Sequence, residues 1–172
     1  MQFTHKTIIQ RIDFFKKKSA KFQQKLMPLI QQTHKAYRDD ILYSEGDQAS
    51  EILFILDGAI KLYFDCSHSL PPNIEFNSRK QAFNVPFSLH PRGSYFGDED
   101  AMLGDDQNAR ENTAVSAESS EIIVIKRQAL DSVLYEFPSI RSEMIKLTKE
   151  KIRYYNFLKE EVRRRYADPQ TI

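Results

Sequence analysis

The chain has 172 residues, with 25 Lys and Arg against 24 Asp and Glu and a formal net charge of +1 at pH 7. This balance produces no overall field that would favour a nucleic acid partner. No apolar run reaches the roughly 20 residues that a membrane span needs, and the N-terminus MQFTHKTIIQ lacks the apolar core of a signal peptide. Cys66 is the only cysteine, so no internal disulfide can form. We therefore expect a cytosolic-type chain with one domain.

The N-terminal segment, residues 1–32, has helical periodicity. Its apolar residues recur three or four positions apart on either side of Ser19, namely Ile8, Ile12, Phe15, Phe22, Leu26 and Leu29. Ser19 is a good N-cap residue, so a second helix is expected to begin directly after it. Pro28 should end or bend that helix, because proline removes a backbone donor.

The middle of the chain, residues 33–126, is expected to be β-structure. It contains short segments rich in β-branched or aromatic residues, namely Ile41–Tyr43, Ile52–Leu56, Ala59–Phe64, Val85–Leu89, Thr113–Ala117 and Ile122–Ile125. Turn signals such as Gly46-Asp47 and Asp57-Gly58 separate several of them. This spacing favours a jelly roll or small barrel over a parallel sheet. The long polar segment 66–84 is interpreted as a mobile insertion.

The last zone, residues 127–166, is predicted to be helical again, followed by a short tail at 167–172. A helix over Arg127–Phe137 precedes Pro138, which can start a new helix in its first turn. That final helix is expected from Ser139 to about Arg165. Its apolar stripe is Ile140, Met144, Leu147, Tyr155, Leu158 and Val162, and Lys151 interrupts it. A helix of this length extends past a small domain, so its far end should contact a protein partner or solvent.

The segment GSYFGDEDAML, from Gly93 to Leu103, is the most informative motif. The chain has only five glycines, and all lie in or beside predicted turns, where glycine supplies backbone conformations that other residues resist. A glycine at a helix start is typical of an anion site, whereas three acids in succession, Asp98 to Asp100, should repel an anion. Enzyme and metal motifs are missing: the four histidines have no metal-ligand spacing, and no P-loop or G-x-S-x-G occurs.

These patterns together resemble the cyclic-nucleotide-binding domain family. The resemblance rests on four stretches that cover most of the chain: ILYSEGDQASEILFILDGAIKLYF (41–64), RGSYFGDEDAML (92–103), TAVSAESSEIIVIKR (113–127) and LDSVLYEFPSI (130–140). The segments IIQRIDFF, GSYFGD and FPSIRSEM are most similar in sequence to the cytosolic C-terminal domains of cation channels, particularly those of ciliates. The resemblance implies a mainly β fold: an eight-stranded jelly roll with N-terminal helices and a long C-terminal helix.

The resemblance also implies a site. In the family a phosphate-binding cassette holds the cyclic phosphate on backbone N–H groups at the start of a short helix. A glutamate after the cassette glycine binds the ribose 2′-hydroxyl, an arginine further along pairs with the phosphate, and the C-terminal helix covers the base. Here the cassette-like helix would lie within residues 93–104. The positions that carry over as ligand-binding are Phe96, Gly97, Asp98, Ala101, Met102, Arg110, Thr113 and Ala114, with Lys149 and Arg153 as candidates for capping the base.

Two departures from the family pattern weaken the expected site. Asp98 stands in place of the glutamate and is one methylene shorter. Alignment on Val115 and Ala117 places Glu111 at the arginine position, with Arg110 one residue too early, unless the loop 105–112 bulges by one residue. The alternative interpretations are that Asp98 is a helix N-cap, that Arg110 is a solvated loop residue balancing nearby acids, and that Lys149 and Arg153 lie on a solvated face.

We therefore expect a regulatory domain that is not an enzyme, requires no cofactor or metal, and has cyclic AMP or cyclic GMP as its candidate ligand. Two hypotheses stay open: a degenerate nucleotide site in a cytosolic module of an ion channel, or a functional cyclic-nucleotide sensor as in a gated channel or a kinase regulatory subunit. No DNA-binding helix-turn-helix follows the long helix. The expected partners are a protein or a parent channel subunit, contacted through that helix, with a membrane involved only indirectly.

Overall fold

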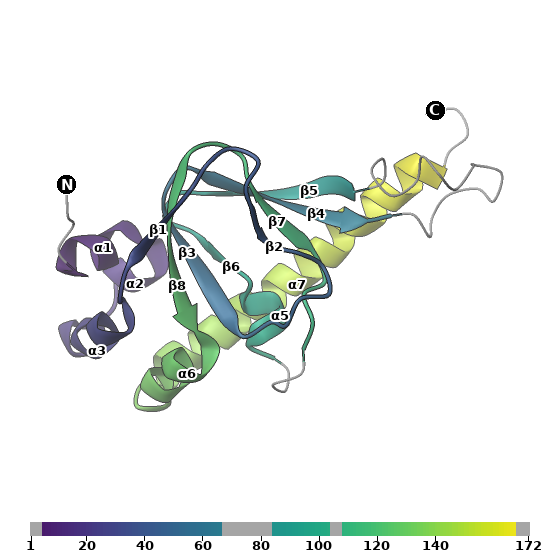
Figure 1. Cartoon of the computed structure of the whole chain (residues 1–172). Coiled ribbons are helices and arrows are strands. Elements are labelled where there is room, and N and C mark those ends of the chain that lie inside the picture. The colour runs from purple at the N-terminus through teal and green to yellow at the C-terminus, as the bar shows by residue number, and fades with distance from the viewer. Residues whose placement is uncertain (1–4, 67–83, 104–107, 168–172) are drawn as a thin grey trace.

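The computed structural model describes residues 5–66, 84–103 and 108–167. Within them two four-stranded sheets form a β jelly roll flanked by helices (Figure 1), with strand orders β1-β8-β3-β6 and β2-β7-β4-β5. The strands are β1 (Thr33–Ala36), β2 (Ile41–Tyr43), β3 (Glu51–Asp57), β4 (Ala59–Asp65), β5 (Asn84–Pro91), β6 (Tyr95–Phe96), β7 (Thr113–Ser116) and β8 (Ser120–Lys126). All pairs are antiparallel. The jelly roll expected from the resemblance is confirmed.

Periodicity located six of these strands and missed two. The first missed strand, β1, reads THKA and exposes two of its four residues, so it has no apolar alternation to detect. The second, β6, has only two residues and pairs with Leu53 and Phe54 of β3. Both strands exist because a neighbouring strand supplies their hydrogen-bond partners, which a local pattern does not report.

Strands β3 and β4 show how the sheets are buried. In β4 the side chains alternate between buried and exposed, as expected for a sheet with one face toward solvent. In β3 five consecutive residues, Ile52 to Leu56, are all buried. This strand is covered on both faces because the N-terminal helices pack on one side of its sheet and the opposite sheet packs on the other.

The N-terminal segment is divided into short helices rather than two longer ones. These are α1 (His5–Arg11), α2 (Asp13–Lys16), α3 (Ala20–Leu26) and a 3₁₀ turn, η1 (Met27–Leu29). Ser19 is the N-cap of α3, and its side chain accepts a hydrogen bond from the Phe22 backbone N–H at 3.3 Å, as predicted. Pro28 lies inside η1, where helical structure ends, in agreement with its effect on backbone hydrogen bonding.

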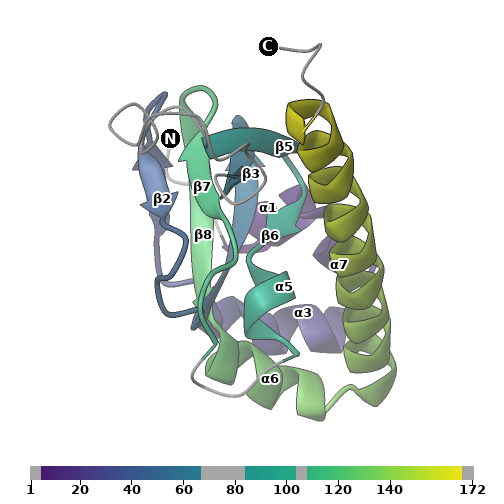
Figure 2. The same ribbon diagram turned by 90° about the vertical axis from the view of Figure 1, so that its right-hand side faces the viewer.

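Two helices follow the last strand: α6 (Arg127–Tyr135) and the 30-residue α7 (Pro138–Ala167). Pro138 occupies the first position of α7, as the sequence predicts. Figure 2 shows α7 along one edge of the molecule, with the short helix α5 (Asp98–Ala101) between α7 and the strands. One long side of α7 therefore covers the roll, and its opposite side faces outward.

The apolar interior consists of two clusters. One joins the N-terminal helices, α6 and the first part of α7 to the outer face of the β3 sheet, and includes Phe15, Phe22, Phe54 and Leu134. The other fills the roll between the sheets and includes Leu62 and Phe96. Tyr155 of α7 belongs to this second cluster, so the C-terminal helix contributes to the hydrophobic core.

Some sequence expectations cannot be compared with the structure. The predicted insertion at 66–84 falls mostly on residues 67–83, which lie outside the described residues, as do residues 104–107 of the loop after the cassette. Among the helices that the structure describes, none combines the length and the apolar composition needed to cross a bilayer.

Candidate functional site

The cassette begins at Gly97, between β6 and α5. Its φ of 81° is in the left-handed region, which glycine adopts without strain. A Cβ atom at this position would lie 2.8 Å from Nη1 of Arg110. The glycine is therefore favoured by the turn into α5, and it also leaves room for the close approach of the Arg110 guanidinium.

Arg110 points into the cassette although it lies one residue earlier than the family pattern places its arginine. The side chain is buried, and Nη1 donates a hydrogen bond to the Gly97 carbonyl at 2.7 Å, while Nη2 donates to the Glu51 carbonyl at 2.6 Å. The guanidinium lies 4.2 Å from the centre of the Tyr43 ring, a cation–π distance. Arg110 is not a solvated loop residue; it joins the cassette to β3 and β2.

Asp98, the residue expected to bind a ribose hydroxyl, contacts α7 instead. Its carboxylate is fully buried, accepts a hydrogen bond from Thr148 Oγ1 at 2.6 Å, and pairs with Lys151 Nζ at 2.5 Å. Lys151 also donates to the Tyr95 carbonyl at 3.0 Å and lies 4.1 Å from the Tyr95 ring centre. The N-cap residue of α5 is Gly97, so Asp98 is the first residue of the helix and not its N-cap. We call this group of Asp98, Thr148 and Lys151 the α7 anchor.

The Glu99 side chain forms a hydrogen bond with the backbone of the cassette itself. Its Oε2 accepts a hydrogen bond from the Gly97 N–H at 2.9 Å, whereas Oε1 is buried without a hydrogen-bond partner. Burial, followed by the charge of Asp98, raises the pKa of Glu99 to about 8. A carboxylate of the chain thus already occupies one backbone donor at the start of the cassette helix.

Asp100 lies beside Arg110, with Oδ2 3.9 Å from Nη1. This is an ion pair without a hydrogen bond, because that oxygen has no donor within hydrogen-bond distance. Burial raises the pKa of Asp100 to about 6, although Arg110 opposes the shift. The main hydrogen bonds of Arg110 go to carbonyls, so its charge compensates Asp100 only in part.

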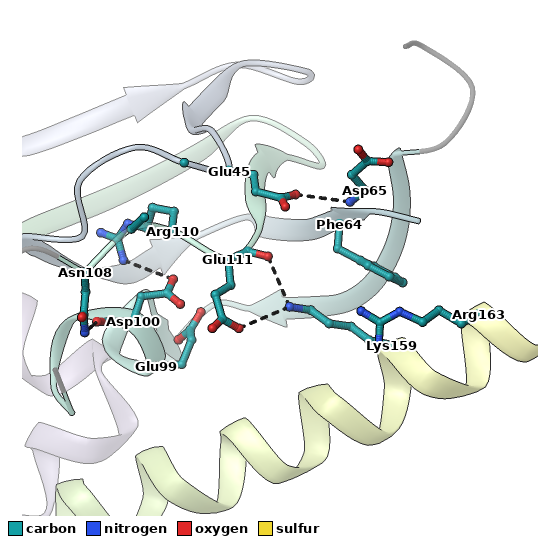
Figure 3. A pocket seen from close by; sticks show the side chains of 12 residues that line it. Glu45, Phe64, Asp65, Glu99, Asp100, Asn108, Arg110, Glu111, Lys159 and Arg163 are labelled. Carbon is teal, nitrogen blue, oxygen red and sulfur yellow. Dashed lines mark hydrogen bonds and ion pairs between the residues drawn. The ribbon is translucent and has the colours of Figure 1, made fainter. Parts of the chain in front are cut away.

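A pocket of about 630 Å³ opens beside the cassette (Figure 3). Lys159 and Arg163 project into it from α7, while Glu99, Asp100 and Glu111 face it from the cassette side. Its lining residues are Glu45, Gly46, Phe64, Asp65, Glu99, Asp100, Asn108, Ala109, Arg110, Glu111, Lys159 and Arg163. Five of these are acids and three are cationic; because the pKa of Glu99 is raised to about 8, four carboxylates face three cations at neutral pH.

The remaining residues carried over from the family are mostly internal. Phe96, Ala101 and Ala114 are almost completely buried in the two cores, and Met102 packs against the first core. Thr113 uses its hydroxyl to accept a hydrogen bond from the Glu45 backbone N–H at 3.0 Å. These residues build the walls of the site but do not line its pocket.

Lys149 and Arg153, the proposed base-capping residues, do not meet the pocket. They are exposed and line a separate shallow depression on the outer side of α7 with Lys146 and Glu150. The cations of α7 that do face the roll are Lys151, in the α7 anchor, Lys159, which donates to the Glu111 carbonyl at 3.2 Å, and Arg163, which lines the pocket.

Sequence reasoning missed Glu99, Thr148, Lys151 and Lys159, although the sequence contained a signal for the two lysines. Both interrupt the apolar stripe of α7, and a cation in such a stripe needs a buried partner. Lys159 is buried near the Phe64 and Phe87 rings, 5.8 and 5.1 Å from their centres. Nothing in the sequence alone indicates which acid Lys151 contacts.

A histidine also connects α7 to the strands. His90 of β5 is buried, and its Nε2 lies 2.5 Å from the Tyr155 hydroxyl and 3.3 Å from Ser88 Oγ. Burial, followed by the Lys151 charge, lowers the pKa of His90 to about 4. The histidine is therefore neutral at neutral pH and acts as a hydrogen-bonding partner of α7. Among the described residues no group of His, Cys, Asp and Glu could hold a metal ion.

The cyclic nucleotide-binding domain profile matches residues 33–136, which is more than half of the chain. The chain belongs to the cyclic nucleotide-binding domain family. Domains of this family are regulatory modules, in agreement with the expected class of function. No curated protein matches the chain significantly.

Solved structures of the cyclic nucleotide-binding domain family share this fold at low identity. The catabolite activator protein of Thermus thermophilus matches with a TM-score of 0.63 and 15% identity, over 87% of this chain and 62% of that one. The regulatory subunit of a cAMP-independent protein kinase A from Trypanosoma brucei matches with a TM-score of 0.68 and 12% identity, over 92% and 50%. The regulatory domain of Toxoplasma gondii protein kinase A, crystallised with cAMP, gives 0.63 and 10%, over 85% and 49%. The chain thus spans about half to two thirds of these structures.

Proposed function

We propose that this chain is a regulatory cyclic nucleotide-binding domain in which α7 is closed on the cassette by the chain's own side chains, with a degenerate nucleotide site. The α7 anchor carries this proposal. Asp98, at the ribose-binding position of the family, has both carboxylate oxygens engaged, by Thr148 and Lys151. A ribose hydroxyl would have to displace a buried ion pair, which is costly because it leaves Lys151 without its counter-charge.

The electrostatics of the pocket support the same proposal. A cyclic phosphate carries one negative charge, and at neutral pH, with Glu99 protonated, four carboxylates line the pocket against three cations. Two of those cations are already in use: Arg110 donates to two carbonyls, and Lys159 donates to the Glu111 carbonyl. Bringing in another anion therefore requires either new cationic contacts or protonation of Asp100.

The second candidate function is a working sensor of cyclic AMP or cyclic GMP. One observation favours it: Arg110 already points at Gly97, so the one-residue offset in sequence does not remove an arginine from the cassette. Its Nε–H has no hydrogen-bond partner among the described residues. In a sensor, nucleotide binding would have to redirect the guanidinium from the Gly97 carbonyl to the phosphate.

Isothermal titration calorimetry separates the two candidates. With the degenerate site we expect no saturable heat from cyclic AMP or cyclic GMP up to millimolar concentrations. Binding in the micromolar range, weakened at least tenfold by Arg110→Lys, would establish the sensor instead. Lysine keeps the charge but cannot make both carbonyl contacts. Arg38→Lys, on the exposed turn after β1, is the matched control.

We also propose that the domain serves as a cytosolic, regulatory part of an ion channel or a similar membrane assembly. The similarity of GSYFGD and FPSIRSEM to ciliate-type channel domains supports this context, as does the outward-facing side of α7, which is available to a partner subunit. Sequencing of the full-length transcript provides the test. We expect membrane-spanning segments encoded upstream of Met1; an upstream region that encodes none would contradict the channel context and leave the family assignment intact.

A further inference from the structure

A second cavity, of about 450 Å³, lies between the N-terminal helices and α7. One wall is α7, where Glu143, Leu147 and Lys151 are four residues apart and therefore lie on one face of the helix. The opposite wall is α2 with the residues directly after it, and the floor is the turn that leads into β6. Of the described residues that line this cavity, none also lines the pocket beside the cassette. We call it the α2–α7 groove; its size is that of a small-molecule site.

The interior of the α2–α7 groove is apolar and contains two aromatic rings. The Phe14 and Tyr95 rings meet edge to face with their centres 5.8 Å apart, and Leu147, which is 37% exposed, lines the same space. Two cations lie over these rings: Lys18 Nζ is 4.4 Å from the Phe14 ring centre, and Lys151 Nζ is 4.1 Å from the Tyr95 ring centre. A flat apolar ring can therefore pack inside the groove while positive charge lies close to it.

The charges around the α2–α7 groove leave one cation unpaired. Two acids and three lysines line it. Four of these five groups already have an oppositely charged partner, in the pairs Lys18–Glu143 at 2.6 Å, Asp13–Lys16 at 2.5 Å and Lys151–Asp98 at 2.5 Å. The fifth, Lys17, is exposed and has neither an ion pair nor a side-chain hydrogen bond among the described residues. One unpaired ammonium group beside an apolar interior is complementary to a ligand with a single negative charge.

We infer that the α2–α7 groove is a second ligand site, which binds a small aromatic monocarboxylate. The aromatic ring packs against Phe14, Tyr95 and Leu147, and the carboxylate pairs with Lys17. A neutral ligand of the same shape loses that ion pair, and a second negative charge on the ligand finds no further unpaired lysine in the described lining. The site is separate from the cassette, so the inference goes beyond the proposed function and holds whether or not nucleotide binds.

A ligand in the α2–α7 groove contacts both walls, so its binding is coupled to the position of α7. The two walls already meet at the Lys18–Glu143 ion pair, and Lys151 belongs both to the groove and to the α7 anchor. A ring packed between Phe14 and Leu147 adds apolar contact area across the same interface. The bound carboxylate should therefore stabilise the docked arrangement of α7 without acting through the cassette.

Isothermal titration calorimetry with 2-naphthoate, a carboxylate on two fused rings, tests the site. We expect a dissociation constant on the order of 100 μM for a ligand of this size. Lys17→Gln should weaken binding about fivefold, as should replacing the ligand by uncharged 2-naphthamide. Leu147→Glu should abolish binding, because it places a carboxylate in the apolar wall. Lys21→Gln, which changes an exposed lysine of α3 outside the groove, is the matched control.

Two results of the calorimetry would overturn the inference. One is the lack of saturable heat from the wild type up to millimolar 2-naphthoate. The other is equal affinity of the wild type, Lys17→Gln and Leu147→Glu, because the ligand would then bind elsewhere. Circular dichroism confirms that each variant is folded before affinities are compared.

Amide chemical shifts measured by NMR locate the bound ligand. 2-Naphthoate should shift the amides of Lys17, Tyr95 and Leu147 and leave that of Gly46, in the pocket beside the cassette, unchanged. Arg163→Gln, which removes a cation from that pocket, should not alter the affinity for 2-naphthoate. Shifts concentrated at Gly46, or a loss of affinity in Arg163→Gln, would place the ligand in the pocket beside the cassette and contradict a second site.

Discussion

Of the three consecutive acids of α5, the first is held differently from the other two. Asp98 faces α7, where Lys151 and Thr148 engage both of its oxygens. Glu99 and Asp100 each leave one oxygen without a hydrogen bond, and the pKa of each carboxyl is raised, mainly by burial. Neighbouring acids in one turn thus differ because of the partners that other elements bring. Asp98 fastens the C-terminal helix, Glu99 occupies the Gly97 N–H at the start of the cassette, and Asp100 places a negative charge beside Arg110.

Replacing Arg110 should have the largest effect on the Glu99–Asp100 side. Arg110→Ala leaves the Gly97 and Glu51 carbonyls and the buried Asp100 carboxylate without their cation, so we expect the free energy of unfolding to fall by roughly 4 kcal/mol. Chemical denaturation measures it, with Arg38→Ala on the exposed turn as the control. A loss below about 1 kcal/mol would mean that Arg110 is not a structural link and is free for a ligand.

The next largest effect should come from the Asp98 side. Lys151→Met keeps the length of the side chain but removes the cation, which leaves the buried Asp98 carboxylate with Thr148 alone. We expect a loss of about 3 kcal/mol in chemical denaturation. Lys146→Met, on the exposed side of the same helix, should change stability by less than about 0.5 kcal/mol. Equal effects of the two substitutions would refute the α7 anchor.

Thr148→Val removes one hydrogen bond from the α7 anchor while keeping the β-branched shape. Because the acceptor is charged and buried, we expect a loss of about 1.5 kcal/mol. Combined with Lys151→Met it should lose less than the sum of the two single changes, since both act on Asp98. Strict additivity in this double-mutant cycle would show that Thr148 and Lys151 do not share a partner.

The last effect concerns Glu99 and depends on pH. The pKa of Glu99 is raised from an ordinary 4.5 to about 8, so between these values the folded chain holds a proton that the unfolded chain has released. The stability contributed by that proton is complete below pH 4.5 and is lost as the pH rises through 8. The stability of Glu99→Gln relative to the wild type should therefore increase steadily from pH 5 to about pH 8 and then level off.

Thermal denaturation across this pH range measures the difference between the two chains. Asp100 and His90 titrate in both, so they cancel in the comparison. Glu118→Gln, on the exposed turn between β7 and β8, should follow the wild type at every pH. A constant difference between Glu99→Gln and the wild type would show that Glu99 does not hold its proton in the folded state.

The sequence predicted the backbone of the site, meaning the turn at Gly97 and the helix α5, better than it predicted the side-chain contacts. Gly97 and the position of α5 followed from the GSYFGD motif, because a turn into a helix has a local signature. The direction of Arg110 and the partner of Asp98 did not follow, since both depend on elements far along the chain: Glu51 is 59 residues from Arg110, and Lys151 is 53 residues from Asp98. The strand β1 was missed for the same reason, as its pairing with β8 is a long-range property.

Hydrogen exchange of α7 without nucleotide tests the central claim, that the chain's own residues hold this helix on the cassette, most directly. We expect slow exchange for wild-type amides from Thr148 to Lys159, at least tenfold faster exchange in Lys151→Met, and no change in Lys146→Met. Added cyclic AMP should not slow the wild type further. Fast exchange in the wild type that becomes slow only with cyclic AMP would contradict the account, because the nucleotide and not the α7 anchor would then be closing the helix.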